Sequence, residues 1–568
     1  MRRNSAAREA WLALPGWTLV AVVLTWPTLA HPASTVPADL GDPLLQAWQL
    51  AWGGHALTTQ PLHPFDSNTF FPLRGTLGFS DSLLGFAPVA WIGSGPSAAL
   101  VRYNIAFVFA GALCGWGAYL LARQLGLRRA GAVVAGAVLA AAPWRAAQAG
   151  HLQILSCGAV PLALALLARG HGLGPGGRTL SLARARPGTA AAGWLVAAWQ
   201  VTLGFGVGLQ WGYALGLVVA AAVVLWVRAG RPTPPARLVV ADVVGGSVFL
   251  TVAALFALPY LAAAREHPES QRSLADLELF SPPLRGFWTA PDTNIVWGGR
   301  QAAYRATLAF PPEMTLALGA VAVTLATLGV IAGRQWTRRR RVVLAASLLT
   351  LLVFALGTHG PLGGRLTYLV LFQHAPGFEG IRTPGRLVVS ATVVLALLAG
   401  LGASVAAGAA AAAGRRWRPG RTGAVASGAL GVVLALAVLA EGADDLAHPA
   451  PAPAPALALR TGAGPLLVLP SDDGSDETTM WWTTDGFPAV ANGTSGFVPS
   501  VTARLRGDAL AFPAEPAVVA LRGYGLRRVL VLLSRYDASS RQLLRTVALP
   551  AGVSRVDVPG EDALVFTL

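Results

Sequence analysis

Charged side chains are scarce in this chain. They make up 12% of its 568 residues, about half of the roughly 25% that is typical of soluble domains. Hydrophobic residues make up 54%, and the mean hydropathy is +0.54. A chain with so little charge and so much apolar surface is not an ordinary soluble protein. The composition therefore predicts an integral membrane protein.

Cysteine is nearly absent as well, with only Cys114 and Cys157 in the whole chain. Both fall inside apolar stretches, where a thiol usually packs as a small apolar group. The sequence therefore offers neither a disulfide framework nor a recognisable zinc site. A small-residue cleavage site is also missing after the first apolar stretch, so we interpret that stretch as an uncleaved first span.

Long apolar stretches are what the chain has in abundance. Segments of about 15 to 25 apolar residues recur along it, as crossing a hydrocarbon core by helix requires. They predict an all-α polytopic membrane protein of about eleven transmembrane helices. The predicted spans are 14–30, 103–122, 131–144, 152–168, 191–204, 208–227, 238–262, 314–333, 342–357, 387–407 and 423–441.

Arginine clusters set the predicted orientation. With the N-terminus in the cytoplasm, every dense cluster falls in an inner loop, as the positive-inside rule requires. These predicted inner loops are 123–129, 169–186, 228–237, 334–341 and 415–421. This count makes the apolar run 83–92 a re-entrant or interfacial helix, because a crossing there would turn Arg128 and Arg129 outward. It places the loops 31–102, 145–151, 263–313 and 358–386, and everything after Glu441, outside. The net charge of +16 is carried by these inner anchors, so we do not expect nucleic acid as a partner.

Composition divides the chain into three predicted parts. Residues 1–441 form the transmembrane module, and residues 442–458, rich in Pro-Ala repeats, form a stiff extended linker. Residues 459–568 form a small α/β domain outside the membrane, in which 466–470 and 528–533 are buried strands and 514–521 is helical. The segment Asn492-Gly-Thr494 matches a glycosylation sequon, but a turn explains it as well and is the favoured interpretation.

Four carboxylates stand in the first outer loop, in a chain with only 27 acidic residues: Asp39, Asp42, Asp66 and Asp81. Displacing a phosphate from an activated sugar needs a base for the attacking hydroxyl. The leaving phosphate is already a good anion, so one aspartate suffices. Asp42 is the best candidate because Gly41 and Pro43 fix its backbone in a turn before a predicted amphipathic helix, 44–52. The dipole of that helix would stabilise the carboxylate by about 0.3 to 1 kcal/mol.

The two early aspartates also have a purely structural explanation. Asp42 can equally be the N-cap of the predicted helix, and Asp39 can cap or assist. Asp66 and Asp81 fit Asx turns, which is the favoured explanation for both.

Aromatic residues of the same loop have two interpretations. Trp48, Trp52 and Phe79 are either anchors at the membrane interface, which is the commoner role, or faces on which a sugar stacks. His55 follows in the same amphipathic run. The candidates for contacting acceptor or sugar are Trp48, His55, Asp66 and Asp81.

A lipid-phosphate donor needs cations, or a metal, to meet its phosphate. Outward positive groups are few: Arg145 and His151 flank a short outer turn, and Arg382 and Arg386 precede a later span. We take these four as candidates for the donor phosphate, with snorkelling to the headgroups as the alternative for each arginine. The residues indicate no definite cofactor and leave a divalent cation open.

Several segments together carry a family resemblance. They are Gly41-Asp42-Pro43 after the first span, and the stretches 117–123, 142–153, 376–386 and 492–499. With these the chain resembles the GT-C class of polyprenyl-phosphate-sugar-dependent membrane glycosyltransferases, in particular uncharacterised bacterial members. The resemblance implies a lipid-linked donor that enters laterally, an acceptor from the outer side, and Asp42 as the catalytic base. Where many members carry an acidic pair such as Asp-Glu, this chain has Asp39-Leu-Gly-Asp42, which leaves open which aspartate acts and whether a metal takes part.

These observations lead to one functional hypothesis and two alternatives. The chain is predicted to be a glycosyltransferase that moves a hexosyl or pentosyl group from a polyprenyl-phosphate donor to an extracytoplasmic glycan, lipid or protein. It would lie in the bacterial cytoplasmic membrane, with the N-terminus inside and the C-terminal domain outside. A transporter or flippase of lipid-linked glycans would be expected to carry ionisable residues at mid-membrane or broken helices in matched halves, and neither is found. A non-catalytic assembly protein would leave the acidic loop unexplained.

Overall fold

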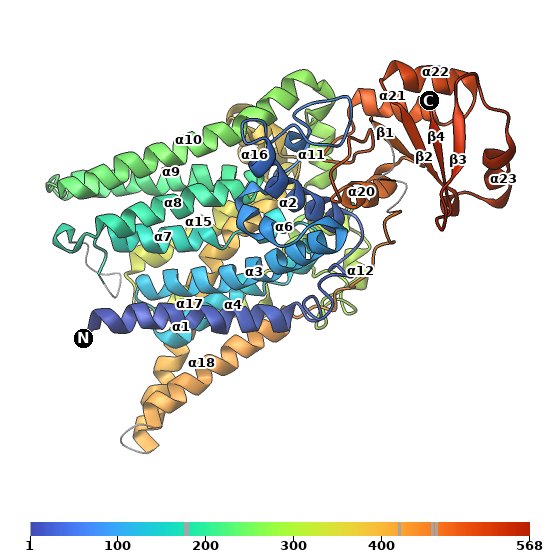
Figure 1. Cartoon of the computed structure of the whole chain (residues 1–568). Coiled ribbons are helices and arrows are strands. Elements are labelled where there is room, and N and C mark those ends of the chain that lie inside the picture. Colours follow the sequence, from blue (N-terminus) through green and yellow to red (C-terminus); the bar gives the residue numbers. More distant parts are fainter. Residues whose placement is uncertain (1, 175–180, 418–421, 456–458, 460–463) are drawn as a thin grey trace. The chain divides into compact units, whose positions relative to one another are not determined.

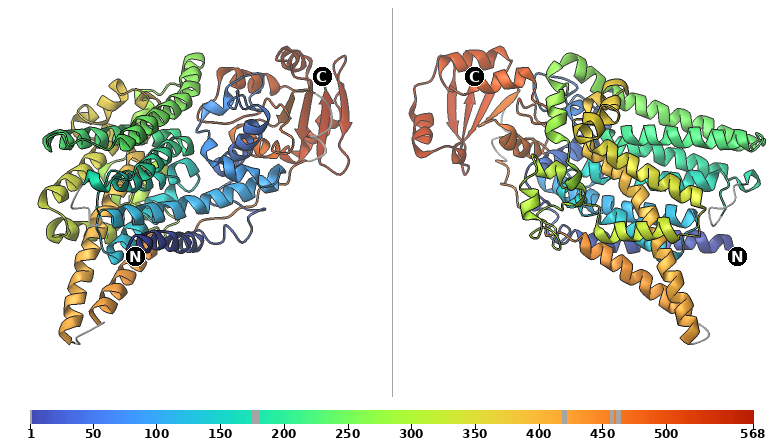
Figure 2. Two further views of the ribbon diagram at one scale, coloured as in Figure 1. Left: turned by 60° about the vertical axis from the view of Figure 1, so that its left-hand side comes forward. Right: turned by 180° about the vertical axis from the view of Figure 1, so that it is seen from behind.

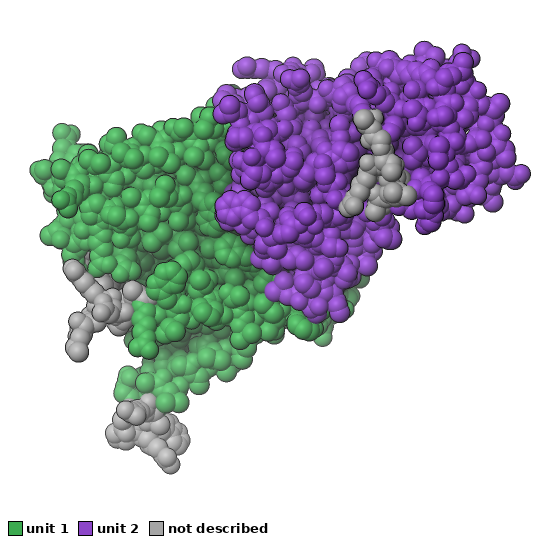
Figure 3. Space-filling view, in the orientation of Figure 1, with its two compact units in different colours: residues 1–27, 107–256, 272–446 green, residues 28–106, 257–271, 447–568 purple. Residues whose placement is uncertain are grey.

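The computed structural model describes residues 2–174, 181–417, 422–455, 459 and 464–568. Parts of the predicted inner loops at 169–186 and 415–421, of the linker and of the start of the C-terminal domain lie outside these residues. The chain forms two compact units, shown in different colours in Figure 3. Unit 1 consists of residues 1–27, 107–256 and 272–446, and unit 2 of residues 28–106, 257–271 and 447–568.

Unit 1 is built from helices, many of which run side by side in Figures 1 and 2. Two of them continue into unit 2: the first residues of α3 and the last residues of α10 belong to that unit. The helices are α1 (Arg2–Leu24), α3 (Gly95–Gln124), α4 (Arg129–Ala140), α5 (Trp144–Ala147), α6 (Leu152–Leu155), α7 (Ala159–Gly170), α8 (Pro187–Leu203), α9 (Phe205–Arg228), α10 (Ala236–Glu266), α11 (Leu274–Phe280), α12 (Ala302–Arg305), α13 (Pro311–Met314), α14 (Ala320–Ala332), α15 (Arg338–Ala355), α16 (Tyr368–His374), α17 (Val388–Trp417) and α18 (Thr422–Glu441).

Length and composition make this a multi-pass membrane protein, as predicted. Among the described residues, seven helical segments are long and apolar enough to cross a membrane, and α14 is a shorter apolar helix. Long stretches of α9 and α10 expose large apolar side chains such as Leu217, Val240 and Leu250, which lipid rather than water must cover. Each of the eleven predicted spans overlaps a helix, while their exact number and their orientation stay predictions.

Small residues let the helices of unit 1 approach closely. A Cβ added to Gly131 in α4 would lie 2.1 Å from the carbonyl oxygen of Gly400 in α17. A Cβ added to Gly402 would collide with the backbone of Leu325 in α14. Close backbone contact through glycine is the usual way in which membrane helices gain van der Waals packing. Helix α17 is thereby held between α4 and α14.

Glu441, the last residue of α18, fixes the start of α14. Its carboxylate accepts hydrogen bonds from the backbone N–H groups of Ala320 at 2.6 Å and Val321 at 2.9 Å, and from the indole of Trp297 at 2.9 Å. A carboxylate at a helix N-terminus satisfies N–H groups that have no partner within the helix. The loop that contains Trp297 is thus tied to two helices.

Unit 2 combines the first loop with the C-terminal part of the chain. Its loop elements are α2 (Asp42–Thr59) and the 3-10 helices η1 (Thr76–Phe79) and η2 (Leu84–Trp91). Helix η2 occupies the run predicted as a re-entrant or interfacial helix. The remaining elements are β1 (Leu466–Leu469), α20 (Asp473–Trp482), α21 (Ser500–Ala509), α22 (Glu515–Gly523), β2 (Arg528–Leu532), α23 (Ala538–Thr546), β3 (Ser554–Asp557) and β4 (Ala563–Thr567).

The four strands form one sheet in the order β1-β2-β4-β3. Strands β1 and β2 are parallel, with Leu466 opposite Arg528, and β4 runs antiparallel to both β2 and β3. The two predicted strands and the predicted helix are confirmed, and the four-stranded sheet with its helices is the small α/β part that was expected. Leu467, Val529 and Phe566 of the sheet share a core with Leu521 of α22.

The proline-rich segment is held in place where the structure describes it. The backbone N–H groups of Val36 and Ala38 donate to the carbonyl oxygens of Pro449 and Ala447, at 3.2 and 2.9 Å. Residues 447–455 form no helix or strand. The domain boundaries derived from composition stay predictions.

Candidate functional site

The predicted catalytic aspartates lie at the start of α2 in unit 2. Gly41 is the N-cap, and Asp42 and Pro43 open the helix. The alternative explanation of Asp42 as the N-cap residue is therefore wrong, because Gly41 holds that position. Asp39 turns back instead, and its Oδ1 accepts a hydrogen bond from the Gly41 N–H at 2.8 Å. Asp39 thus shapes the turn, and Asp42 stands in the first helical turn, where the dipole favours its charge.

Buried hydrogen bonds fix α2 in unit 2. The indole of Trp48 donates to Asn68 at 3.1 Å, and the indole of Trp52 donates to the carbonyl oxygen of Pro64 at 3.0 Å. Trp48 is only 2% exposed and packs against Leu45, Leu77 and Met480. This burial favours a packing role for Trp48 over either a membrane-belt or a sugar-stacking role.

Helix α20, from the C-terminal part of the chain, brings a third carboxylate to this turn. A Cβ added to Gly41 would lie 3.1 Å from Asp39 Oδ1 and 3.1 Å from Glu477 Oε2. The two carboxylates therefore flank the same point, which leaves little room for a side chain at position 41. Burial, together with the charges of Asp42 and Asp39, raises the pKa of Glu477 to about 8. Glu477 is thus mostly protonated at neutral pH, which avoids a third negative charge in the cluster.

Sequence reasoning missed Glu477 because it looked for carboxylates only in the first loop. The one available signal was the acidic run 472–477 in an otherwise weakly charged chain. Such a run is usually a solvated helix start, and Asp472 does serve as the N-cap of α20.

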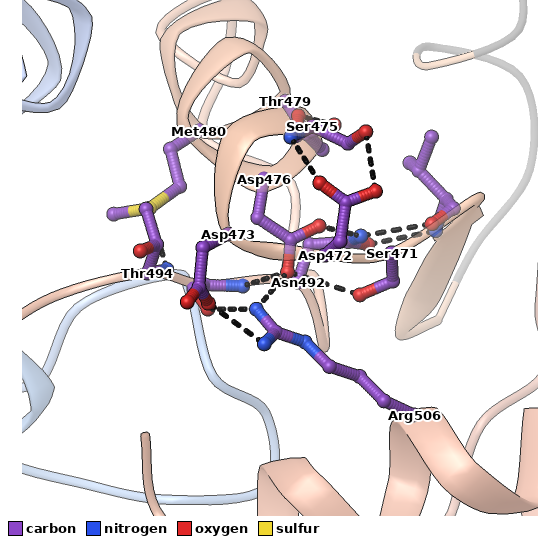
Figure 4. Close-up of polar contacts among 12 residues, drawn as sticks. Ser471, Asp472, Asp473, Ser475, Asp476, Thr479, Met480, Asn492, Thr494 and Arg506 are labelled. Carbon is purple, nitrogen blue, oxygen red and sulfur yellow. Dashed lines mark hydrogen bonds and ion pairs between the residues drawn. The ribbon is translucent and has the colours of Figure 1, made fainter. Parts of the chain in front are cut away.

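A buried ionic network, drawn in Figure 4, holds α20 in position. Asp476 is fully buried and accepts hydrogen bonds from Asn492 at 2.7 Å, Ser471 at 3.0 Å and the Gly493 N–H at 3.1 Å. Arg506 pairs with Asp476 at 2.9 Å. Burial raises the pKa of Asp476 despite these partners. Because Asp476 directly precedes Glu477, the network fixes the part of α20 that faces Gly41.

The sequon residue Asn492 belongs to the same network. Its side chain is fully buried, accepts from the Val468 N–H at 2.7 Å and donates to the Val468 carbonyl at 2.8 Å. These bonds tie the loop after α20 to strand β1. Because Asn492 is buried, a structural role of the Asn492-Gly-Thr494 segment is favoured over glycosylation.

The other candidate residues of the first loop, Asp66, Asp81 and His55, lie in different environments. Asp66 Oδ1 accepts from the Gly75 N–H at 2.8 Å, so it ties together two parts of the loop that are nine residues apart rather than forming an Asx turn. Asp81 is half-buried between η1 and η2. The His55 ring lies 4.5 Å from the ring of Phe487, and burial lowers its pKa. The assignment of these residues to sugar or acceptor stays a prediction.

The four predicted phosphate ligands lie in unit 1, in three different settings. Arg145 is 9% exposed, and its guanidinium donates to the Leu155 carbonyl at 3.3 Å and to the Cys114 sulfur at 3.7 Å. It lines a small cavity with Asp444. Burial raises the pKa of Asp444 to about 7, although a hydrogen bond from Asn294 and the charge of Arg145 oppose the shift.

His151 and Arg386 are brought together around a residue that the sequence did not reveal, Glu313. Arg386 Nε donates to Glu313 Oε2 at 3.1 Å, and Gln148 donates to the same oxygen at 3.3 Å. Burial opposes the charge of Glu313, but the charges of Arg386 and His151 hold its pKa below the ordinary value. The charge of Arg386 is therefore largely balanced inside the protein. No sequence signal marks Glu313, which follows two prolines in an unremarkable loop.

Arg382 has two neighbours, Phe280 and Arg272, and the sequence analysis did not single out Arg272. The guanidinium of Arg382 lies 4.6 Å from the ring centre of Phe280. Burial and the positive charge of Arg382 lower the pKa of Arg272. The nearby acid is Asp276, which is engaged in the capping box of α11 with Ser273. Arg272 and Arg382 thus bring two positive charges close together, near the carboxylate of Asp276.

A metal site is not apparent in the parts of the chain that the structure describes. No group of three or more His, Cys, Asp or Glu residues there is arranged to hold a metal ion. The three carboxylates around Gly41 thus do not form a ready-made cation site.

Comparisons with known proteins identify the fold. No family model matches the chain, and no curated protein is similar to it in sequence. A mutant form of arabinofuranosyltransferase AftD from Mycobacteria has a similar structure, with a TM-score of 0.51 and 15% identity, over 99% of this chain and 41% of that one. The other similar structures include the oligosaccharyltransferase of Archaeoglobus fulgidus, with a TM-score of 0.49 and 14% identity over 94% of this chain and 70% of that one. ArnT from Cupriavidus metallidurans, bound to undecaprenyl phosphate, has a TM-score of 0.42 and 15% identity over 98% of both chains.

At a sequence identity of 14 to 15%, a similar structure is evidence for the fold alone. The chain has a fold like that of the GT-C membrane glycosyltransferases, so the family resemblance predicted from its motifs is confirmed at the level of fold. The chain spans 41% of the length of the AftD chain that it matches.

Proposed function

We propose that this protein is a membrane glycosyltransferase that transfers a sugar from a polyprenyl-phosphate donor to an acceptor hydroxyl, with Asp42 as the general base. The observation that carries this proposal is the carboxylate cluster at the start of α2, where Asp42 lies beside Asp39 and Glu477. The GT-C-like fold supports the reaction class. It does not identify the substrate, because a fold by itself does not specify one.

In the proposed reaction, Asp42 removes the proton from the acceptor hydroxyl. The acceptor oxygen then forms a bond to the anomeric carbon, while the bond from that carbon to the phosphate oxygen breaks. The polyprenyl phosphate leaves as an anion, so no acid is needed on that side. Asp39 keeps the Gly41 turn in shape, and the protonated Glu477 leaves Asp42 as the ionised base.

Arg382 and Arg272 are proposed to bind the donor phosphate. Guanidinium groups recognise phosphate oxygens in a bidentate manner, and these two arginines lie close enough for their charges to interact. Arg386, whose charge is balanced by Glu313, is a weaker candidate than the sequence suggested. Arg145 and His151 remain candidates for the same role.

The test is a donor-consumption assay with the purified full chain in proteoliposomes, whose inner and outer faces can be probed separately. The chain is incubated with hexosyl and pentosyl polyprenyl phosphates and with delipidated envelope glycans, lipids and peptides as acceptors. The expected result is release of free polyprenyl phosphate that depends on both substrates. Translocation of intact donor without its cleavage would support a flippase, and the absence of both would support an assembly protein.

A variant at Glu477 should change how transfer depends on pH. In the wild-type protein, ionisation above about pH 8 adds a negative charge beside Asp42 and repels the donor phosphate. We expect the KM for the donor to rise above that pH, and Glu477→Gln to remove the rise. The folded-state pKa is raised, so the contribution of this carboxyl to stability is full below its unfolded value of roughly 4.3 and is lost as the pH rises through about 8. Glu515→Gln, at an exposed position of the same unit, should keep the wild-type profile.

Removing both proposed phosphate ligands should weaken donor binding. We expect the double variant Arg272→Gln, Arg382→Gln to raise the KM for the lipid donor by at least about tenfold, since charge-assisted hydrogen bonds contribute roughly 1.5 to 3 kcal/mol each. Initial rates over a range of donor concentrations give the KM. Arg300→Gln is the matched control, because Arg300 is exposed and lies in the predicted outer loop 263–313 that also contains Arg272. An unchanged KM in the double variant would move the phosphate site to Arg145, His151 or Arg386.

A further inference from the structure

The only two cysteines of the chain meet in the folded protein. Cys114 lies in α3 and Cys157 just before α7, and 43 residues separate them in sequence. Their sulfur atoms are 3.6 Å apart, and both residues are fully buried. The sequence did not predict this contact between the two thiols, and the proposed transfer reaction uses neither of them.

Glycines force this contact. A Cβ added to Gly158, next to Cys157, would lie 2.4 Å from the backbone nitrogen of Cys114. A Cβ added to Gly117 would lie 2.4 Å from the carbonyl oxygen of Gly158. The backbones of α3 and of the segment before α7 therefore touch directly, which holds the two cysteines next to each other.

The two thiols are not equivalent. Arg145 places its guanidinium 3.7 Å from the sulfur of Cys114, and the Cys114 thiol donates to the Leu155 carbonyl at 3.4 Å. Thiols beside a guanidinium are the ones that act most readily as nucleophiles. Cys157 contacts the Cys114 sulfur and is placed to attack it.

A small cavity borders two of the residues that contact Cys114. It has a volume of about 60 Å³ and is lined by Gly111, Arg145, Leu155 and Asp444, among others. Two of these residues, Arg145 and Leu155, make the polar contacts to the Cys114 thiol. The volume is enough for about two water molecules at roughly 30 Å³ each. The cavity does not include Cys114 and is too small for a disulfide of the size of glutathione, so exchange at Cys114 takes place when the surrounding helices open locally.

We propose that Cys114 and Cys157 are a redox-active dithiol, which closes to an intramolecular disulfide by exchange with a low-molecular-weight or protein disulfide. The Cys114 sulfur attacks the oxidant R–S–S–R, forms a mixed disulfide and releases one thiolate, which takes up the Cys114 proton. The Cys157 sulfur then attacks the Cys114 sulfur and displaces the second thiolate, which takes up the Cys157 proton. Two cysteine thiols are thereby oxidised, and one disulfide of the oxidant is reduced to two thiols.

Closure has two consequences for the structure. It links α3 to the start of α7 covalently, which restricts the unfolded chain across the 43-residue separation and raises the thermal stability. It also removes the hydrogen bond from Cys114 to Leu155 and changes the sulfur that faces Arg145. The dithiol would thus couple the redox environment to the turn that carries Arg145.

The experiment uses the purified full chain in glutathione redox buffers, approached from the reduced and from the oxidised side. After an acid quench, free thiols are alkylated in denaturant, and the chain is digested with trypsin without reduction. Cleavage at the arginines places Cys114 in peptide 103–123 and Cys157 in peptide 146–169. We expect these peptides to appear as one linked species, lighter than their sum by two hydrogen atoms and separated again by dithiothreitol. We also expect the oxidised protein to melt several degrees above the reduced one.

Single variants make every outcome decisive. Cys157→Ser should become glutathionylated at Cys114, whereas the melting temperature of Cys114→Ser should not rise with oxidation. A glutathionylated Cys157→Ser variant together with a wild-type protein that never closes would overturn the proposal. So would failure of oxidised glutathione to modify either protein, because an unreachable dithiol is not redox-active.

Discussion

Replacing Asp42 by asparagine should lower the rate of sugar transfer by at least about 100-fold, because general base catalysis contributes roughly 10² to 10⁴ to a rate. Asparagine has nearly the same shape as aspartate and sits at the same position in the first turn of α2. The fold should therefore persist while the base is lost. Initial rates of polyprenyl-phosphate release at saturating donor would measure the effect, which should fall on kcat.

Two matched variants show whether the effect belongs to Asp42. Asp39→Asn keeps an oxygen that can accept the Gly41 N–H, so we expect a loss of less than about tenfold in rate, compared with the general base contribution above. Asp66→Asn, at a residue that ties together two parts of the same loop, should behave like the wild-type protein. A nearly active Asp42→Asn beside an inactive Asp39→Asn would exchange the two roles. Full activity in both would remove the proposed mechanism.

Replacing Arg506 by glutamine should strongly destabilise the C-terminal part of the chain. Asp476 would remain fully buried without its cation, and removing one partner of a buried ion pair typically costs about 3 to 5 kcal/mol. Hydrogen exchange of the full chain, read on peptides that contain β1 and β2, would report the lower free energy of local opening. Transfer activity should fall as well, since the same network positions Glu477 on α20.

The control lies on the same helix. Arg504 is exposed on α21, so Arg504→Gln should change the opening free energy by no more than about 0.5 kcal/mol. Equal exchange rates in Arg506→Gln and the wild-type protein would mean that hydrogen bonds to Asp476 from Asn492, Ser471 and Gly493 stabilise it without the arginine. The network would then be a polar cluster rather than an ion pair that holds α20.

Much of the fold could be predicted from local patterns. Apolar stretches of membrane-spanning length marked the helices, and the short apolar runs at 466–470 and 528–533 marked the parallel strands β1 and β2. The helix after Gly41 was predicted for 44–52, whereas α2 begins two residues earlier, at Asp42, and extends to Thr59. These features depend on neighbours within a few residues, which is the range that periodicity and turn chemistry report.

The candidate site was predictable only in part. Asp42 stood out as a carboxylate in a turn, but nothing near it in sequence revealed that Glu477 would approach Gly41 from the other end of the chain. Glu313 and Arg272 were missed for the same reason. The sequence placed Arg386 among the candidate phosphate ligands, whereas the structure pairs it with the buried Glu313.

The amino-acid sequence by itself determined that this is a membrane protein, that a helix follows the turn at Gly41, and that a small sheet follows the last apolar stretch. The tertiary structure alone decided which charges share an environment and which lone cysteines touch. Burial and electrostatic coupling depend on distances through space, and residues hundreds of positions apart acquire those distances only when the helices pack.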